Sequence, residues 1–179
     1  TVIMAAFAAA VKIDAFAYMP VQDFGNAFST FIAQNYGAKE HERIRSGLKY
    51  AIYISMAFCL GISVLVCLFT KQLMSIFIDA KETEIIMQGV QYLHIEGAFY
   101  CGIGCLFLLY GLYRALGKPG MSVVLTIISL GTRVVLAYLL SAVPFFGVTG
   151  IWWAVPIGWG FADLVGVLYY FAKKQTLLA

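Results

Sequence analysis

Long apolar stretches alternate with short polar or charged segments along the whole 179-residue chain. An α-helix needs about 20 consecutive apolar residues to cross the hydrocarbon core of a bilayer, and five stretches reach that length. The pattern therefore predicts an all-α fold, a polytopic bundle of transmembrane helices. The predicted spans are residues 15–36, 50–69, 90–113, 121–143 and 151–172.

The basic residues gather on every second connection between these spans, whereas acidic residues outnumber them on the other side. Because Lys and Arg are retained on the cytoplasmic side of a membrane, we expect residues 37–49, residues 114–118 and the C-terminus in the cytoplasm. This predicts a multi-pass protein of a bacterial plasma (inner) membrane. The basic residues behind the prediction are Lys39, Arg43, Arg45, Lys49, Arg114, Lys118, Lys173 and Lys174.

The apolar run at residues 2–11 comes before the first span and is too short to cross a bilayer by itself. It predicts either one long helix or two pieces bent near Pro20, with Lys12 and Asp14 at the headgroups as interfacial anchors. Five spans that end in the cytoplasm begin outside, so we expect at least one preceding helix. Residues 1–179 are therefore interpreted as part of a longer protein whose N-terminal lobe is missing.

Composition supports the membrane class, because 62% of the residues are apolar and only 12% are charged. Soluble domains average about 25% charged residues. The net charge of +3 is spread over the ends of the spans, and no basic patch suggests a nucleic-acid partner. The four cysteines lie in apolar runs with no His or further Cys to complete a ligand set, so we expect no metal site and no cofactor.

The first span carries four polar side chains inside an otherwise apolar helix. A polar group that faces lipid costs several kcal/mol, so such groups turn toward a bundle interior or a hydrated cavity. We expect these side chains to line a binding path for a substrate or ion. They are Gln22, Asp23, Asn26 and Gln34.

Three more ionisable residues lie inside predicted spans, namely Glu96, Arg133 and Asp163. Asp23 and Glu96 fall in the outer half of the membrane, where each either binds H⁺, Na⁺ or a cationic substrate or is satisfied by a neighbouring group. Arg133 lies near the midplane, and we expect it to be a structural charge partner for one of them. Asp163 lies toward the cytoplasmic half, as an ion-binding candidate or as part of a pair near the interface.

Several segments resemble the multidrug and toxic compound extrusion (MATE) family of transporters. The sequence QDFGNA at residues 22–27, followed by QNYGAK at residues 34–39, resembles the family's second-helix type motif. In that motif a glycine and small residues come first, and a Q-x-x-G-A sequence follows at the cytoplasmic end of the helix. GLYRALGK at residues 111–118 resembles the end of the family's tenth helix, and residues 129–133 resemble its eleventh. By this resemblance the chain would be helices eight to twelve, most of the C-terminal lobe.

The resemblance implies a twelve-helix protein of two six-helix lobes that works by alternating access. It would be an antiporter that exports amphipathic, often cationic drugs or toxic compounds in exchange for H⁺ or Na⁺, with its own N-terminal lobe and the lipid bilayer as partners. Many members carry an acid near the middle of the tenth helix, where this chain has Ile103 and Gly104. The coupling carboxylate would then lie in the missing half, or be Glu96 on chemical grounds.

Three alternatives remain open at this point. A lipid or lipid-linked oligosaccharide flippase of the same superfamily would need more basic residues in its cavity than Arg133 alone. A membrane enzyme would need a nucleophile–base or metal constellation, and the sequence shows none, so we expect no enzyme. A scaffold subunit without transport would be unaffected by Asp23→Asn and Glu96→Gln together.

Overall fold

A computed structural model of the chain describes residues 2–145 and 147–177, and these residues form six helices and no strand. The expected all-α fold is thereby confirmed. The helices are α1 (Val2–Gly37), α2 (His41–Phe77), α3 (Thr83–Gly97), α4 (Tyr100–Ala115), α5 (Pro119–Ser141) and α6 (Gly147–Leu177).

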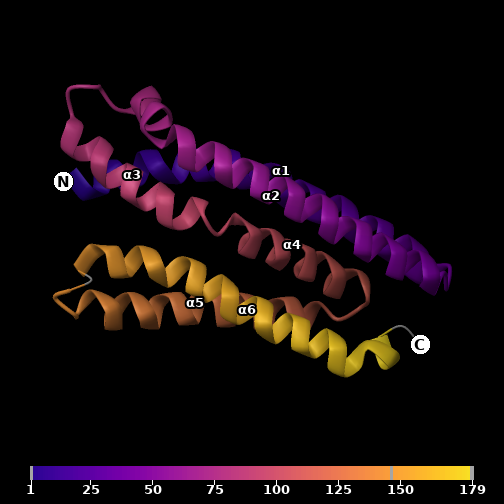
Figure 1. Ribbon diagram of the computed structural model, residues 1–179. Helices are drawn as coiled ribbons and strands as arrows, with labels where there is room; N and C mark the ends of the chain where they lie inside the picture. Colours follow the sequence, from indigo (N-terminus) through magenta and orange to yellow (C-terminus); the bar gives the residue numbers. More distant parts are fainter. Residues whose placement is uncertain (1, 146, 178–179) are drawn as a thin grey trace.

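The helices are arranged in three layers that run along one common direction (Figure 1). Helices α1 and α2 lie side by side on one edge, the α3–α4 pair lies in the middle, and α5 and α6 form a hairpin on the opposite edge. Helix α4 contacts α1, α2, α5 and α6, so it joins the two outer layers. The middle layer therefore brings side chains from both edges of the bundle together.

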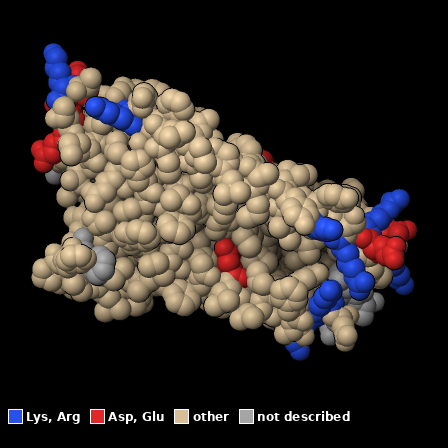
Figure 2. Space-filling model, in the orientation of Figure 1, with Lys and Arg blue, Asp and Glu red and all other residues tan. Residues whose placement is uncertain are grey.

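Four helices, α1, α2, α5 and α6, are long and apolar enough to cross a membrane. The α3–α4 pair makes a fifth span if its two parts, bent by 51°, are counted as one. On the face that Figure 2 shows, most Lys, Arg, Asp and Glu side chains gather at the two ends of the bundle, and only a few acidic atoms are visible between them. This distribution is typical of a protein that crosses a bilayer several times.

The first span differs from the expectation at its N-terminal end. Helix α1 continues without interruption through Pro20 and includes residues 2–11, so one long helix is present and not two bent pieces. Lys12 is exposed and lies over the Phe77 ring, 5.8 Å from its centroid. Asp14 is not an interfacial anchor, because its side chain is only 2% exposed and packs inside the bundle.

The third span is interrupted where the sequence predicts one continuous helix over residues 90–113. Helix α3 ends at Gly97 and α4 begins at Tyr100. The N–H of Phe99 donates to the Glu96 carbonyl (3.0 Å), which closes the last turn of α3 one residue early. The break places Glu96 and Tyr100 on either side of a bend that faces α1.

Close backbone contacts occur at two glycines, one between the layers of α1 and α4 and one within the α5–α6 hairpin. A Cβ atom at Gly111 would lie 2.6 Å from the Gly25 carbonyl oxygen, and a Cβ at Gly158 would lie 2.7 Å from the Ser129 carbonyl oxygen. Contacts this short leave no room for any side chain. Helices α1 and α4, and likewise α5 and α6, therefore cross at positions that require glycine.

Candidate functional site

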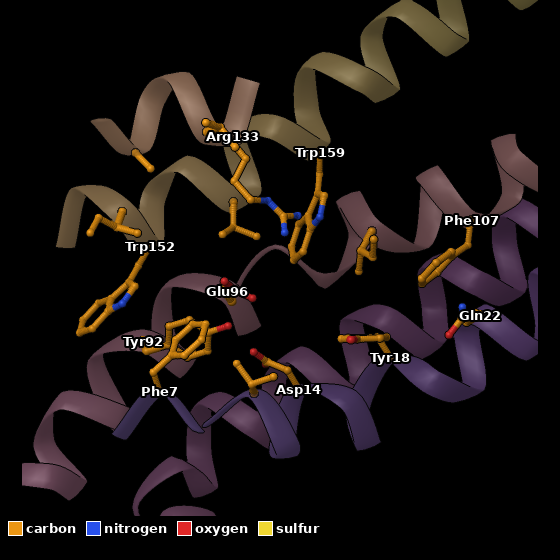
Figure 3. Close-up of a pocket in the computed structure, with 16 residues that line it drawn as sticks. Phe7, Asp14, Tyr18, Gln22, Tyr92, Glu96, Phe107, Arg133, Trp152 and Trp159 are labelled. Carbon is orange, nitrogen blue, oxygen red and sulfur yellow. The ribbon is translucent and has the colours of Figure 1, made fainter. Parts of the chain in front are cut away.

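A cleft of about 590 Å³ lies between the two edges of the bundle (Figure 3). One wall comes from α1, α3 and α4, and the facing wall comes from α5 and α6. Most of the lining is apolar or aromatic, including Phe7, Phe107, Trp152 and Trp159. A largely apolar cavity with a few polar groups is typical of a small-molecule site.

Two carboxyl groups meet inside this cleft, one from α1 and one from α3. Asp14 is 2% exposed and Glu96 is 5% exposed. The Tyr100 hydroxyl donates a hydrogen bond to Asp14 Oδ1, whereas Asp14 Oδ2 is buried and has no hydrogen-bond partner among the described residues. The Tyr92 hydroxyl points into the space between the two carboxyl groups (Figure 3). The arrangement is an acidic centre shielded from solvent.

Helical periodicity explains why Asp14 reaches the interior and Asp23 does not. The buried stripe of α1 includes Ala10, Ala17 and Val21, which lie four, three and seven residues from Asp14. Residues at these spacings share one face of a helix. Asp23 lies two positions after Val21, which turns it to the other side, and its side chain is exposed. Sequence reasoning missed Asp14, although the stripe of small residues around it was a usable signal.

Arg133 lines the cleft from α5, on the wall opposite the acidic centre (Figure 3). Its charge attracts Glu96 across the cleft. Its Nε atom is buried without a hydrogen-bond partner in the part of the chain that the structure describes. The expected role as a structural charge partner stays a prediction, but Arg133 and Glu96 do share one cavity.

Aromatic rings close the end of the cleft that lies near the start of α1. The rings of Phe7 and Tyr92 meet edge to face with centroids 5.4 Å apart, and those of Tyr92 and Trp152 do so at 5.8 Å. Ring faces attract organic cations, most strongly where water is excluded. The same cleft therefore offers negative charge and π surface to one ligand.

A second cleft of about 400 Å³ adjoins the first, and Gln22 and Phe107 line both. Its charged group is Arg114, whose Nη2 donates to Asn26 Oδ1 (2.9 Å) and whose Nε donates to the Tyr110 carbonyl (3.3 Å). These bonds hold the guanidinium at the cavity wall. The second cleft is thus basic where the first is acidic.

Some of the site residues predicted from the sequence line a cleft, and others do not. Glu96, Gln22 and Arg133 line the first cleft, and Asn26 and Gln22 line the second. Three others line neither cleft. Asp23 and Gln34 are exposed, and Asp163 is half-buried against α4, where its Oδ2 would lie 3.7 Å from a Cβ at Gly102. Their roles stay predictions, as do those of the residues that the clefts contain.

No group of three or more His, Cys, Asp or Glu side chains that could hold a metal ion occurs within residues 2–145 and 147–177. The two clefts present carboxyl groups, aromatic rings and guanidinium groups. They are built from side chains on rigid helices and not on loops.

Comparisons with known proteins identify the family and the fold of the chain. The profile of the family described as MatE matches residues 1–139. The "Probable multidrug resistance protein YoeA" of Bacillus subtilis (strain 168) is 26% identical over 175 residues, which cover 96% of this chain and 37% of YoeA. The "Multidrug export protein MepA" of Staphylococcus haemolyticus is 30% identical over 158 residues, which cover 86% of this chain and 34% of MepA.

Among solved structures, the outward-facing conformation of a multidrug resistance MATE family transporter of the MOP superfamily superposes with a TM-score of 0.91 at 22% identity. The match covers 98% of this chain and 39% of that one. It shows that the fold is shared. The chain spans little more than a third of the length of the curated relatives that it matches.

Proposed function

This chain belongs to the MatE family of transporters, and from that premise we propose that the intact protein exports amphipathic, often cationic drugs or toxic compounds across the plasma membrane in exchange for H⁺ or Na⁺. The similarity to YoeA, described as a probable multidrug resistance protein, and to MepA, described as a multidrug export protein, supports this direction. Family membership also favours a transporter over an enzyme.

The observation that carries the proposal is the shared cleft of Asp14, Glu96 and the aromatic rings. An amphipathic cation presents an apolar body, which suits Trp152 and Trp159, and a positive charge, which suits the carboxylates. A small cation would compete for the same carboxylates. Loading of the drug and loading of the ion then exclude each other, which is the requirement for antiport.

Alternating access is part of the same proposal. The cleft lies between the α1–α4 side and the α5–α6 hairpin, and an N-terminal lobe of the intact protein would complete the path. Residues 37–49, residues 114–118 and the C-terminal end would face the cytoplasm, as the basic residues on them favour. Drug would then enter from the cytoplasmic side and leave on the other.

A lipid or lipid-linked oligosaccharide flippase is the second candidate, and the basic second cleft is the observation that favours it. Arg114 is a suitable partner for a phosphate group, because its guanidinium offers several donors in a fixed geometry. The larger cleft is acidic, however, and would repel a phosphate. Export of cations is therefore the better-supported function.

The test uses the intact protein in proteoliposomes and a fluorescent amphipathic cation such as ethidium. We expect ethidium transport that an imposed H⁺ or Na⁺ gradient drives and that Glu96→Gln abolishes. Glu84→Gln is the matched control, since Glu84 lies on the same helix but is exposed at its first turn. Ethidium transport that is unaffected by either gradient would contradict the antiporter proposal. Movement of a fluorescent phospholipid in place of ethidium would contradict it as well.

A further inference from the structure

A cavity of about 590 Å³ lies between the C-terminal end of α2 and helix α3, apart from the two clefts. None of the described residues that line it also lines either cleft. We propose that this α2–α3 cavity binds an anionic phospholipid of the outer leaflet, with the Lys71 ammonium group selecting the negatively charged headgroup. The site goes beyond the proposed export, and it takes from that proposal only the orientation of the chain.

The α2–α3 cavity lies at the end of the bundle that faces outward in the proposed orientation. Helix α2 begins at His41 and runs to Phe77, so its C-terminal end and the start of α3 lie far from the basic residues 37–49 (Figure 1). The proposed orientation puts those basic residues in the cytoplasm. The cavity would therefore open where headgroups of the outer leaflet meet the protein.

Helix phase places the lining on two facing helix surfaces. Lys71 and Ser75 are four residues apart on α2, and Thr83, Met87 and Gln91 follow one another at the same interval on α3. Residues four apart share one face of a helix. One face of each helix thus supplies a wall of the cavity.

Contacts between α2 and α3 hold these two walls in place. The His94 ring, which also lines the cavity, donates from Nε2 to the Cys67 carbonyl on α2 (3.0 Å). The Met74 side chain is completely buried and lies so close to Gly89 that a Cβ atom there would collide with it. The two helices are therefore already in position before a ligand binds.

The charge of the lining favours an anion. Lys71 lines the cavity, and no Asp or Glu occurs among the described lining residues. A Lys near a membrane surface strengthens the binding of an anionic lipid by about fivefold. The acids nearest in sequence are exposed and lie outside the lining, namely Asp79, Glu82 and Glu84. The cavity therefore suits a headgroup with a negative charge.

The uncharged polar groups suit a phosphodiester that carries hydroxyl groups. The Thr83 hydroxyl and the amide groups of Gln88 and Gln91 are donors for phosphate oxygens. The Ser75 hydroxyl donates to the Lys71 carbonyl (2.8 Å), so it meets a ligand as an acceptor. An acceptor beside a cation matches the headgroup of phosphatidylglycerol, which has both glycerol hydroxyls and a negative phosphate.

The apolar part of the lining favours a whole phospholipid over free phosphate. Ile86 is buried, Val90 is half-buried and Met87 is 71% exposed, so the apolar wall continues from the cavity to the outer surface of the bundle. The acyl chains of a bound lipid would lie along this surface, whereas inorganic phosphate would leave it uncovered. The committed occupant is therefore the lipid.

The experiment counts phospholipids bound to the intact protein by native mass spectrometry in dodecyl maltoside, with no drug and no gradient present. Phosphatidylglycerol is compared with phosphatidylcholine of the same acyl chains, which has a phosphodiester but no net charge. We expect the first phosphatidylglycerol to bind about fivefold more tightly than the first phosphatidylcholine. Inorganic phosphate at millimolar concentration should not displace it. Equal affinities for the two lipids, or displacement by phosphate, would overturn the proposal.

Charge variants assign the preference to Lys71. Lys71→Gln should remove the preference for phosphatidylglycerol. Lys81→Gln is the matched control, because Lys81 is an exposed Lys of the adjoining loop that does not line the cavity, and it should retain the preference. Both side chains are exposed, so neither change should shift thermal unfolding in detergent. A preference that survives in Lys71→Gln would contradict the proposal.

Bulky variants test the cavity itself. Thr83→Trp places a large ring at an exposed position of the lining and should weaken binding of the first phosphatidylglycerol by about tenfold or more. Lys81→Trp adds the same ring outside the cavity and should leave binding unchanged. Full affinity in Thr83→Trp would place the lipid elsewhere and sink the proposal. Since the assay contains no drug, a failure here leaves the export proposal standing, and a failure of ethidium transport leaves the lipid site standing.

Discussion

The two adjoining clefts share Gln22 and Phe107 on their walls but differ in charge. The larger cleft contains Asp14 and Glu96, buried and surrounded by aromatic rings, whereas the smaller one contains Arg114, held at the surface by Asn26. A buried acid interacts strongly with a ligand because water does not screen it, and an exposed guanidinium is screened. We therefore expect the acidic cleft to contribute more to the binding free energy of a ligand than the basic cleft does.

The largest expected effect comes from removing both acids of the first cleft. Asp14→Asn combined with Glu96→Gln removes two charge-assisted contacts, each worth about 1.5–3 kcal/mol, so gradient-driven export should fall by more than about 100-fold. Ethidium transport in proteoliposomes under an imposed H⁺ or Na⁺ gradient measures this. A double variant with near wild-type export would show that the acidic cleft does not couple the ion to the drug.

The next largest effect is expected at the close contact between α1 and α4, the two helices that supply Gln22 and Phe107 to both clefts. Gly111→Ala places a methyl group against the Gly25 carbonyl oxygen and should lower the free energy of unfolding by about 1–3 kcal/mol. Thermal unfolding in detergent measures it. Gly61→Ala is the control, because a Cβ atom at Gly61 meets nothing within 4 Å. Equal stability of the two variants would argue against close α1–α4 packing.

A smaller effect is expected from the aromatic end of the first cleft. Trp152→Leu keeps an apolar side chain but loses the π surface, so affinity for an organic cation should fall by about 0.5–2 kcal/mol. An uncharged amphipathic compound of similar size should lose much less. Binding of both compounds by fluorescence quenching makes the comparison. Equal losses would mean that Trp152 contributes packing alone.

The smallest effect is expected in the second cleft. Arg114→Gln removes the hydrogen bond to Asn26 and should reduce ethidium export by about tenfold at most, since a net hydrogen bond contributes about 0.5–1.5 kcal/mol. The matched variant Lys118→Gln removes a nearby exposed charge that does not line the cleft. A collapse of export in Arg114→Gln alone would reverse the ranking of the two clefts and favour an anionic substrate.

Hydropathy explains why the spans could be located from the sequence. Helix α2 contains the predicted span 50–69, α5 covers most of 121–143, and α6 covers all of 151–172. An apolar run of that length is stable only inside a membrane or in a buried core, so its position can be read from the sequence. The break between α3 and α4 gave no comparable signal. Gly97 lies next to it, but similar glycines at 102 and 104 lie inside α4 without breaking it.

The site residues were predictable in part. Glu96 stood out because a carboxylate inside an apolar run is expensive, and it does line the acidic cleft. Asp23 stood out for the same reason, but the phase of α1 turns it to the exposed side. Asp14 was assigned to the headgroups because it lies near one end of the predicted span. Its hydrogen-bond partner inside the bundle, Tyr100, is 86 residues away in the chain.

The sequence by itself therefore determined the all-α, membrane-spanning class of the chain and roughly where its long apolar helices lie, since the hydrophobic effect acts on composition within one local segment. Only the tertiary structure decided which polar side chains share a cleft. Helix phase, the α3–α4 bend and the close contact of α1 with α4 together set which way each side chain faces, and a span's hydropathy is the same in every orientation. Asp14, Glu96 and Arg133 come from three helices that only packing brings together.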